Sequence, residues 1–143
     1  MTGPVLCAVD VSNPHQDEEV LRRAARLAEL DGAQLDVITV VPDYGMSVVG
    51  SYFGRGHHEK LEAEARRLLN ELVGEVLGAE RNRKVRHIVT TGNAYDEILR
   101  VARADGASLI VIGAHKPDFS DYLLGPNAAR VVRHATCSVM VVR

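Results

Sequence analysis

Asp10 is the residue of this sequence best suited to ligand chemistry, because it directly follows a short apolar run at residues 5–9. A carboxylate at the end of a buried strand accepts hydrogen bonds from ribose hydroxyls or holds a cation. It also serves as a cap, since an Asp side chain accepts hydrogen bonds from backbone N–H groups at a helix entry. The residue type is therefore compatible with ligand contact and with turn capping.

A second group of candidates lies between Gly113 and Gly125 and in the helical segment that follows. His115 and Lys116 have the chemistry to meet phosphate oxygens. Backbone N–H groups at a helix N-terminus, with the positive end of the helix dipole, form a general anion site. A plainer interpretation is also open. Gly113 would then form a tight turn and Gly125 an N-cap, and His115 and Lys116 would be solvated charges of a loop. Neither the P-loop nor the dinucleotide-binding glycine pattern is present.

We find no catalytic or metal-binding constellation in the sequence. His57 and His58 are adjacent at a helix start and cannot share one helix face. Cys7 and Cys137 lie far apart with no zinc-ligand spacing, so we interpret them as small core residues in a reducing compartment. Ser120 has no identifiable His/Asp base. We therefore expect no catalytic residues and no metal site.

The composition excludes several classes of protein. Hydrophobic residues make up 46% and charged residues 25%, as in a soluble globular protein. Four Tyr, two Phe and no Trp, with a net charge of −2, argue against a nucleic-acid partner. The N-terminus does not resemble a signal peptide, and no run approaches the roughly 18 apolar residues of a membrane span. We therefore expect a cytoplasmic protein.

The elements that must position the candidate residues alternate between strands and helices. Short apolar runs predict strands at residues 5–9, 35–41, 85–90, 109–112 and 138–142. Helical spacing predicts helices that end at Gly32 and near Gly106, and others at 58–77 and 126–135. Residues 43–57 contain four glycines and little periodicity, which predicts a mobile loop. This loop holds Tyr44, Tyr52 and Phe53, and we consider both a ligand-ordered lid and a plain surface loop.

Five strands alternating with helices predict one α/β domain over residues 1–143, a parallel sheet with helices on both faces. In the order 3-2-1-4-5, ligands bind beyond the strands at the switch point between the first and fourth strands. Asp10 and Gly113 follow those two strands, and Val40 and Val41 offer an apolar wall next to them. A phosphate-accepting receiver domain is disfavoured, because it needs a carboxylate where this chain has Thr90.

Segments along the whole chain, taken in order, resemble the universal stress protein family. They are VLCAVDVS, LDVITVVPD, GNAYDEIL, ASLIVIGAHKP and YLLGPNAARVVRHATCSVMVV, the last two being the most specific. The resemblance implies a fold of the adenine-nucleotide alpha hydrolase-like type, with a protein that is often dimeric and made under stress. The Gly-Ala-His-Lys-Pro and Tyr-Leu-Leu-Gly-Pro-Asn segments resemble a sub-branch in which nucleotide binding is reported for some members.

The resemblance also implies which residues would contact a nucleotide. Asp10 would contact the ribose and Val40 the adenine. The phosphates would lie against Gly113, Lys116, Gly125, Asn127 and Ala128, and His115 is a further candidate beside them.

The chain departs from the pattern of family members that hold ATP, which is Gly-x-x-Gly, nine residues, then Gly-Ser/Thr. Lys116 stands at the second glycine, Gly125 comes one residue early, and Pro126 replaces the hydroxyl residue. Because Pro126 has no N–H, the helix N-terminus loses one donor that could face a phosphate. Lys116 adds a positive charge that compensates in part.

We therefore predict a stress-response regulatory protein that binds ATP or AMP, with or without Mg²⁺, and has at most slow ATP hydrolysis. The alternative is a dimeric stress-response interaction protein that does not bind nucleotide, and Pro126 and the early Gly125 favour it. Asp10, Gly113, Lys116 and Gly125 favour nucleotide binding. The downstream protein partner is not identified by the sequence.

We also expect a homodimer that forms through the predicted edge strand Ser138–Val142. This strand is short and apolar, and it has no Pro or Lys that would protect an exposed edge. Antiparallel pairing with a second copy would satisfy its free N–H and C=O groups. A strand covered by its own chain or by Arg143 would instead leave a monomer.

Overall fold

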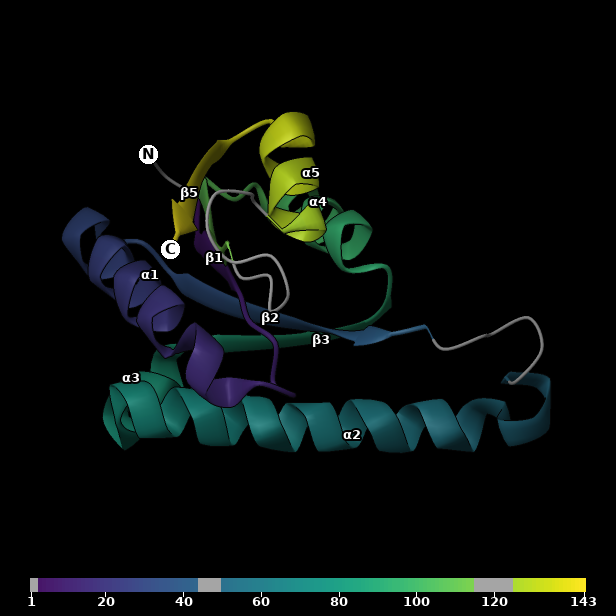
Figure 1. Ribbon diagram of the computed structural model, residues 1–143. Helices are drawn as coiled ribbons and strands as arrows, with labels where there is room; N and C mark the ends of the chain where they lie inside the picture. Colours follow the sequence, from purple (N-terminus) through teal and green to yellow (C-terminus); the bar gives the residue numbers. More distant parts are fainter. Residues whose placement is uncertain (1–2, 44–49, 115–124) are drawn as a thin grey trace.

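Five parallel strands form the sheet, in the order β3-β2-β1-β4-β5, and helices lie on both of its faces (Figure 1). The computed structural model describes residues 3–43, 50–114 and 125–143, with the backbone alone for residues 50–58. The predicted fold class and strand order are confirmed. The strands are β1 (Val5–Ala8), β2 (Leu35–Pro42), β3 (Arg86–Gly92), β4 (Leu109–Gly113) and β5 (Ser138–Val142).

Every connection between consecutive strands contains a helix, as the crossover between parallel strands requires. Helices α1 and α2 cover one face of the sheet, and α4 and α5 cover the other (Figure 1). Among the described residues, no helix is long and apolar enough to cross a membrane. The helices are η1 (Pro14–Asp17), α1 (Glu18–Asp31), α2 (Gly50–Leu77), α3 (Ala79–Lys84), α4 (Ala94–Asp105) and α5 (Pro126–His134).

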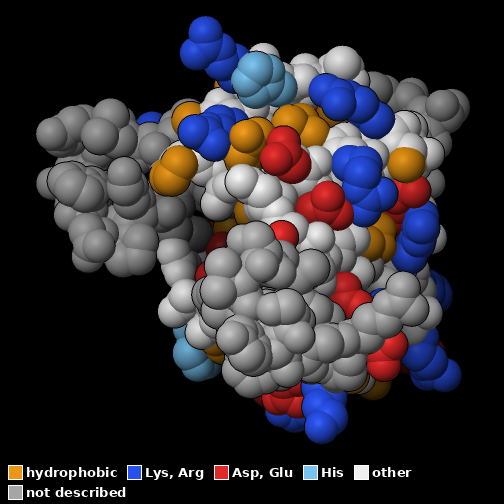
Figure 2. Space-filling view, turned by 90° about the vertical axis from the view of Figure 1, so that its right-hand side faces the viewer, with side chains coloured by type: hydrophobic (Ala, Val, Ile, Leu, Met, Phe, Trp, Pro, Cys, Tyr) orange, Lys and Arg blue, Asp and Glu red, His pale blue; other side chains and the backbone are white. Residues whose placement is uncertain are grey.

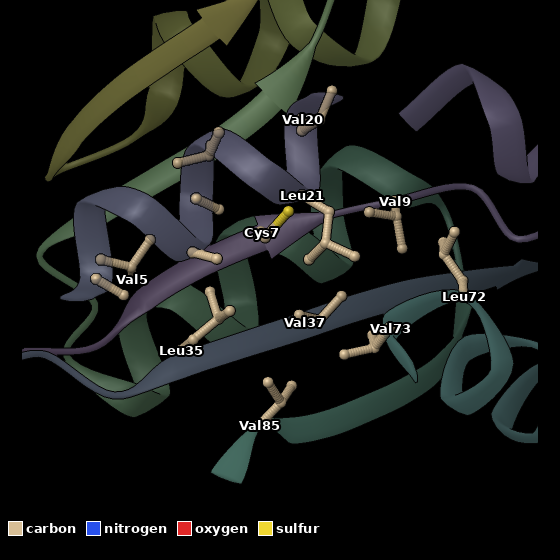
Figure 3. Close-up of a cluster of buried hydrophobic side chains, with 14 of the residues drawn as sticks. Val5, Cys7, Val9, Val20, Leu21, Leu35, Val37, Leu72, Val73 and Val85 are labelled. Atoms are coloured by element: carbon tan, nitrogen blue, oxygen red, sulfur yellow. The ribbon is translucent and has the colours of Figure 1, made fainter. Parts of the chain in front are cut away.

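The core has two layers, one on each face of the sheet, because successive side chains of a strand point to opposite faces. Val5, Cys7 and Val9 pack with α1 and α2 (Figure 3), whereas Leu6 and Ala8 pack with α4 and α5. Each fully buried Val or Leu side chain contributes about 1.5–3 kcal/mol to stability. Burial on both faces fixes the strand register, and with it the positions of the residues beyond each strand end.

Two helix ends lie where the sequence predicts them, because each is followed by a glycine in the left-handed conformation. Gly32 has a φ of 62° and Gly106 a φ of 63°. The N–H groups of these glycines bond back to the last turns of α1 and α4. Residues with a Cβ adopt this conformation at a cost, so glycine is the common helix terminator.

The predicted start of the long second helix is wrong. Helix α2 begins at Gly50, so residues 50–57 of the predicted loop are helical rather than irregular. Once the amphipathic part of the helix is packed, each further residue adds a hydrogen bond without a new nucleation step, and this outweighs the low helix propensity of glycine. Residues 44–49 of the predicted loop, and the side chains on which the lid hypothesis depends, lie outside the described residues. The short helix α3, which begins after Gly78, was not predicted either.

Candidate functional site

A cavity of about 640 Å³ lies at the carboxyl end of the sheet, at the switch point between β1 and β4. The ends of β1, β2 and β4 form its walls, together with the first turn of α5 and parts of α2 and α4. His115 and Lys116 lie outside the described residues. The other predicted site residues all line this cavity, and they are Asp10, Val40, Gly113, Gly125, Asn127 and Ala128.

The exposed side chain of Asp10 caps its own turn at the exit of β1. Its Oδ1 accepts hydrogen bonds from the Ser12 N–H at 3.0 Å and from the Ser12 hydroxyl at 2.6 Å. Its Oδ2 accepts one longer bond of 3.3 Å, from the Asn13 amide. An ionised carboxylate has about four acceptor positions, so Asp10 has a capping role and keeps acceptor capacity for a ligand.

Asp17 lies in the cavity lining and was not singled out as a site residue by the sequence. Only 6% of its surface is exposed, and its Oδ2 accepts a hydrogen bond of 2.7 Å from the Asp10 N–H. The sequence shows three consecutive acids at this helix start, Asp17, Glu18 and Glu19. The sequence alone does not show which of these three acidic side chains is buried at the cavity.

Helix α2 supplies an apolar wall that the sequence did not predict. Leu61, Ala65 and Leu68 line the cavity. The 28 residues of α2 span about 42 Å at about 1.5 Å per residue, whereas the eight residues of β2 span about 26 Å. The helix therefore extends past the carboxyl end of the sheet (Figure 1), and its apolar stripe faces the cavity there instead of the core.

The N-terminus of α5 presents backbone donors to the cavity. Gly125 is the N-cap, and the Ala129 N–H makes the first backbone bond to the Gly125 carbonyl, at 3.0 Å. The N–H groups of Asn127 and Ala128 therefore have no partner within the helix. Pro126 occupies the first helical position, as expected, and offers no N–H.

The match to known proteins covers the whole chain. The model of the universal stress protein family matches residues 1–143. The chain belongs to this family. Universal stress protein G of Shigella flexneri is 32% identical over 145 residues, a match that covers 100% of both chains. The predicted family is confirmed.

Solved structures of universal stress proteins share this fold. The universal stress protein from Archaeoglobus fulgidus in complex with dAMP has a TM-score of 0.62 and 23% identity, and the match covers 99% of this chain and 98% of that one. A universal stress protein in complex with cAMP has a TM-score of 0.66 and 17% identity, over 100% of this chain and 99% of the other.

In this universal stress protein, the charged residues of the described cavity lining are acidic. They are Asp10, Asp17 and Glu64, and no Lys, Arg or His of the described ranges joins them. A hydrogen bond from Arg67 holds the pKa of Glu64 below its usual value. Lys and Arg side chains gather instead over the upper part of this end of the molecule, where α5 lies (Figure 2). In the described part of the site, positive potential therefore comes from backbone N–H groups at helix N-termini, and α5 begins at the cavity with Pro126, Asn127 and Ala128 in its lining.

Two further observations bear on the chemistry of the family member. Burial, and to a smaller extent the charge of Asp17, raise the pKa of the Cys7 thiol, so this cysteine stays protonated in the core. Over residues 3–43, 59–114 and 125–143, no group of three or more His, Cys, Asp or Glu is placed to hold a metal ion.

Proposed function

We propose that this universal stress protein binds an adenine nucleotide, ATP or AMP, in the cavity at the switch point. It would act as a cytoplasmic, stress-response regulatory protein with little intrinsic turnover. The observation that carries the proposal is the convergence on one cavity of a carboxylate, an apolar wall and backbone N–H groups that have no partner within α5. Its volume of about 640 Å³ lies within the range of about 300–1,000 Å³ for small-molecule sites.

Each part of an adenine nucleotide has a counterpart in the lining. The apolar wall, Val40 with the α2 residues Leu61 and Leu68, suits a planar base. Asp10 suits the ribose hydroxyls, because the Oδ2 of this residue keeps acceptor capacity. The Asn127 and Ala128 N–H groups suit a phosphate.

Two adenine-nucleotide complexes of fold relatives support the same class of ligand. The two neighbours described above were solved with dAMP and cAMP. Each of these ligands carries one phosphate group. The absence of an N–H at Pro126 should reduce the affinity for such a ligand less than the affinity for ATP, which has three phosphates. For ATP, Lys116 and His115 are the residues proposed to meet the additional phosphate charge.

The first test is the identification of nucleotide that co-purifies with the protein, by mass spectrometry after denaturation. We expect AMP or ATP at a substantial molar fraction. Calorimetric titration of the stripped protein with AMP, ATP and GTP then measures affinity and base preference. Stripped protein that binds neither AMP nor ATP would overturn the proposal and leave the interaction protein as the function.

That second candidate, a dimeric interaction protein, is favoured by Pro126, which offers no N–H to a phosphate at the start of α5. The dimer itself would form at the edge strand β5. Within the described part of the chain, β5 pairs only with β4, and its residues Val139, Met140 and Val141 are half-buried. We propose that β5 pairs with its copy in a homodimer. Such a dimer is compatible with either function.

A further inference from the structure

We infer that Asp17 is a positioning residue that fixes Asp10 for the ribose and so sets a preference for ribonucleotides over deoxyribonucleotides. The inference rests on the proposed function, since it concerns the same cavity. It adds a role for a buried residue that does not itself need to contact the ligand.

The backbone of Asp10 is held at both of its polar groups. Its N–H donates to Asp17 Oδ2 at 2.7 Å, and its carbonyl accepts from the Asn13 N–H at 3.1 Å. The bond to Asp17 is charge-assisted, which makes it about twice as strong as a neutral hydrogen bond. The segment between β1 and α1 is thereby closed into one loop, with Asp10 at its start.

Asp17 is well suited to hold this loop because the core fixes its own place. It is the N-cap residue of α1, and Val20 and Leu21 of the following turn are fully buried. A buried carboxylate is costly unless it is hydrogen-bonded, so the arrangement that satisfies Asp17 is strongly preferred. The rigid part of the molecule therefore determines the backbone position of Asp10.

The side chain of Asp10 is oriented in turn by its neighbours. Two bonds from Ser12 hold Oδ1, whereas among the described residues Oδ2 has only the 3.3 Å bond from Asn13. A ribose hydroxyl would thus meet an acceptor that is already in place and loses little freedom on binding. A site built to bond a hydroxyl rejects an analogue that lacks it, because the acceptor is left unpaired. If the loop were loose, Asp10 could turn to water and this discrimination would decrease.

The test compares affinities for AMP, 2′-deoxy-AMP and 3′-deoxy-AMP by calorimetry. For the unmodified protein we expect AMP to bind roughly tenfold more tightly than the analogue that lacks the bonded hydroxyl. Asp17→Ala should reduce this ratio to below about threefold. Asp17→Asn, which keeps an acceptor oxygen, should restore most of it.

A matched control removes a neighbouring charge without touching the loop. Glu19, two residues further on, is exposed, pairs with Arg23 at 3.6 Å and does not line the cavity. Glu19→Ala should leave the ratio between AMP and its deoxy analogues unchanged. A fall of the same size in this variant would overturn the assignment to Asp17.

The outcomes separate this inference from the proposed function. If folded Asp17→Ala keeps the ratio, or loses affinity for all three nucleotides equally, the positioning role is wrong and nucleotide binding stands. If the unmodified protein binds none of them, the proposed function fails as well.

An NMR measurement covers the case in which Asp17→Ala does not fold. The bond to Asp17 should shift the amide proton of Asp10 downfield, and Asp17→Asn should move it upfield. An Asp10 amide proton without a downfield shift in the unmodified protein would overturn the inference.

Discussion

Asp36 of β2 and Arg86 of β3 are partners in the parallel register, and Arg86 Nη1 lies 3.7 Å from Asp36 Oδ2. The same nitrogen lies 3.2 Å from Asp105 Oδ1 at the end of α4. Asp36 is 1% exposed, and no donor among the described residues makes a hydrogen bond to either of its carboxylate oxygens. A buried and a half-buried carboxylate beside one guanidinium are best satisfied when they share a proton.

The first prediction concerns the pH dependence of stability. Burial, and after it the hydrogen bond that a proton shared with Asp105 would make, raise the pKa of Asp36 to about 6, against a smaller opposing effect of Arg86. The folded protein therefore binds this proton more tightly than the unfolded chain, so the stabilisation is complete below about pH 4 and lost as the pH rises through about 6. Asp36→Asn should raise the free energy of unfolding by about 1–3 kcal/mol at pH 8 and not at pH 4.

Urea denaturation at both pH values measures this difference. Arg86→Gln removes the neighbouring cation, so it should enlarge the loss of stability between pH 5 and 8. An Asp36→Asn effect of equal size at pH 4 and pH 8 would contradict the shared proton.

The second prediction concerns the ribose contact. Asp10→Ala should weaken AMP or ATP binding by about 1–3 kcal/mol, since it removes an acceptor for the sugar hydroxyls. The same change should lower the free energy of unfolding by about 0.5–1.5 kcal/mol, because the hydrogen bonds from Ser12 that close the turn are lost. Calorimetry and urea denaturation measure the two effects separately. Unchanged affinity in the folded variant would exclude a ribose contact.

The third prediction concerns the donor that is missing from α5. Pro126→Ser restores an N–H and adds a hydroxyl, so ATP should bind more tightly, by about 1.5–3 kcal/mol for each charge-assisted bond formed. Pro126→Ala restores the N–H alone and should give the smaller part of the gain. If neither variant binds ATP better than the unmodified protein, the missing donor does not limit affinity.

The fourth prediction concerns Lys116, which stands where family members that hold ATP have glycine. Lys116→Ala should loosen ATP binding and reduce its dependence on salt, because an ion pair with a phosphate is screened. Affinity measured at low and high salt gives both quantities. An unaltered salt dependence would place this charge away from the phosphates.

The fifth prediction concerns assembly through β5. Light scattering at tens of micromolar protein should give the mass of a homodimer, and Val141→Lys or Met140→Pro should give a folded monomer, because each disrupts the pairing of an edge strand. Val132→Lys is the control, since Val132 is exposed on α5, outside this strand. A monomeric unmodified protein would refute the β5 dimer.

The parts of the site that could be predicted from the sequence depend on local signals. Apolar runs mark where strands end, so the placement of Asp10 and Gly113 at neighbouring strand ends follows once the strand order is assumed. Gly125 and Pro126 mark a helix start in the same local way.

The parts that could not be predicted depend on long-range geometry. Leu61 and Leu68 belong to the same apolar stripe as the core residue Leu69, and only the length of α2 relative to the sheet separates them. Asp36 lies within an apolar run, and its partners Arg86 and Asp105 are found only when the strand register and the end of α4 are known.

Because α2 extends past the sheet, some of its apolar side chains can be covered by a ligand instead of by the sheet. Leu61, Ala65 and Leu68 face a cavity, so a bound base would supply the apolar surface that the sheet supplies further along the helix. A ligand that binds only the folded state adds stability that grows with the logarithm of its concentration. If a nucleotide binds as proposed, the stability of the part of α2 that lines the cavity would therefore depend on the nucleotide concentration.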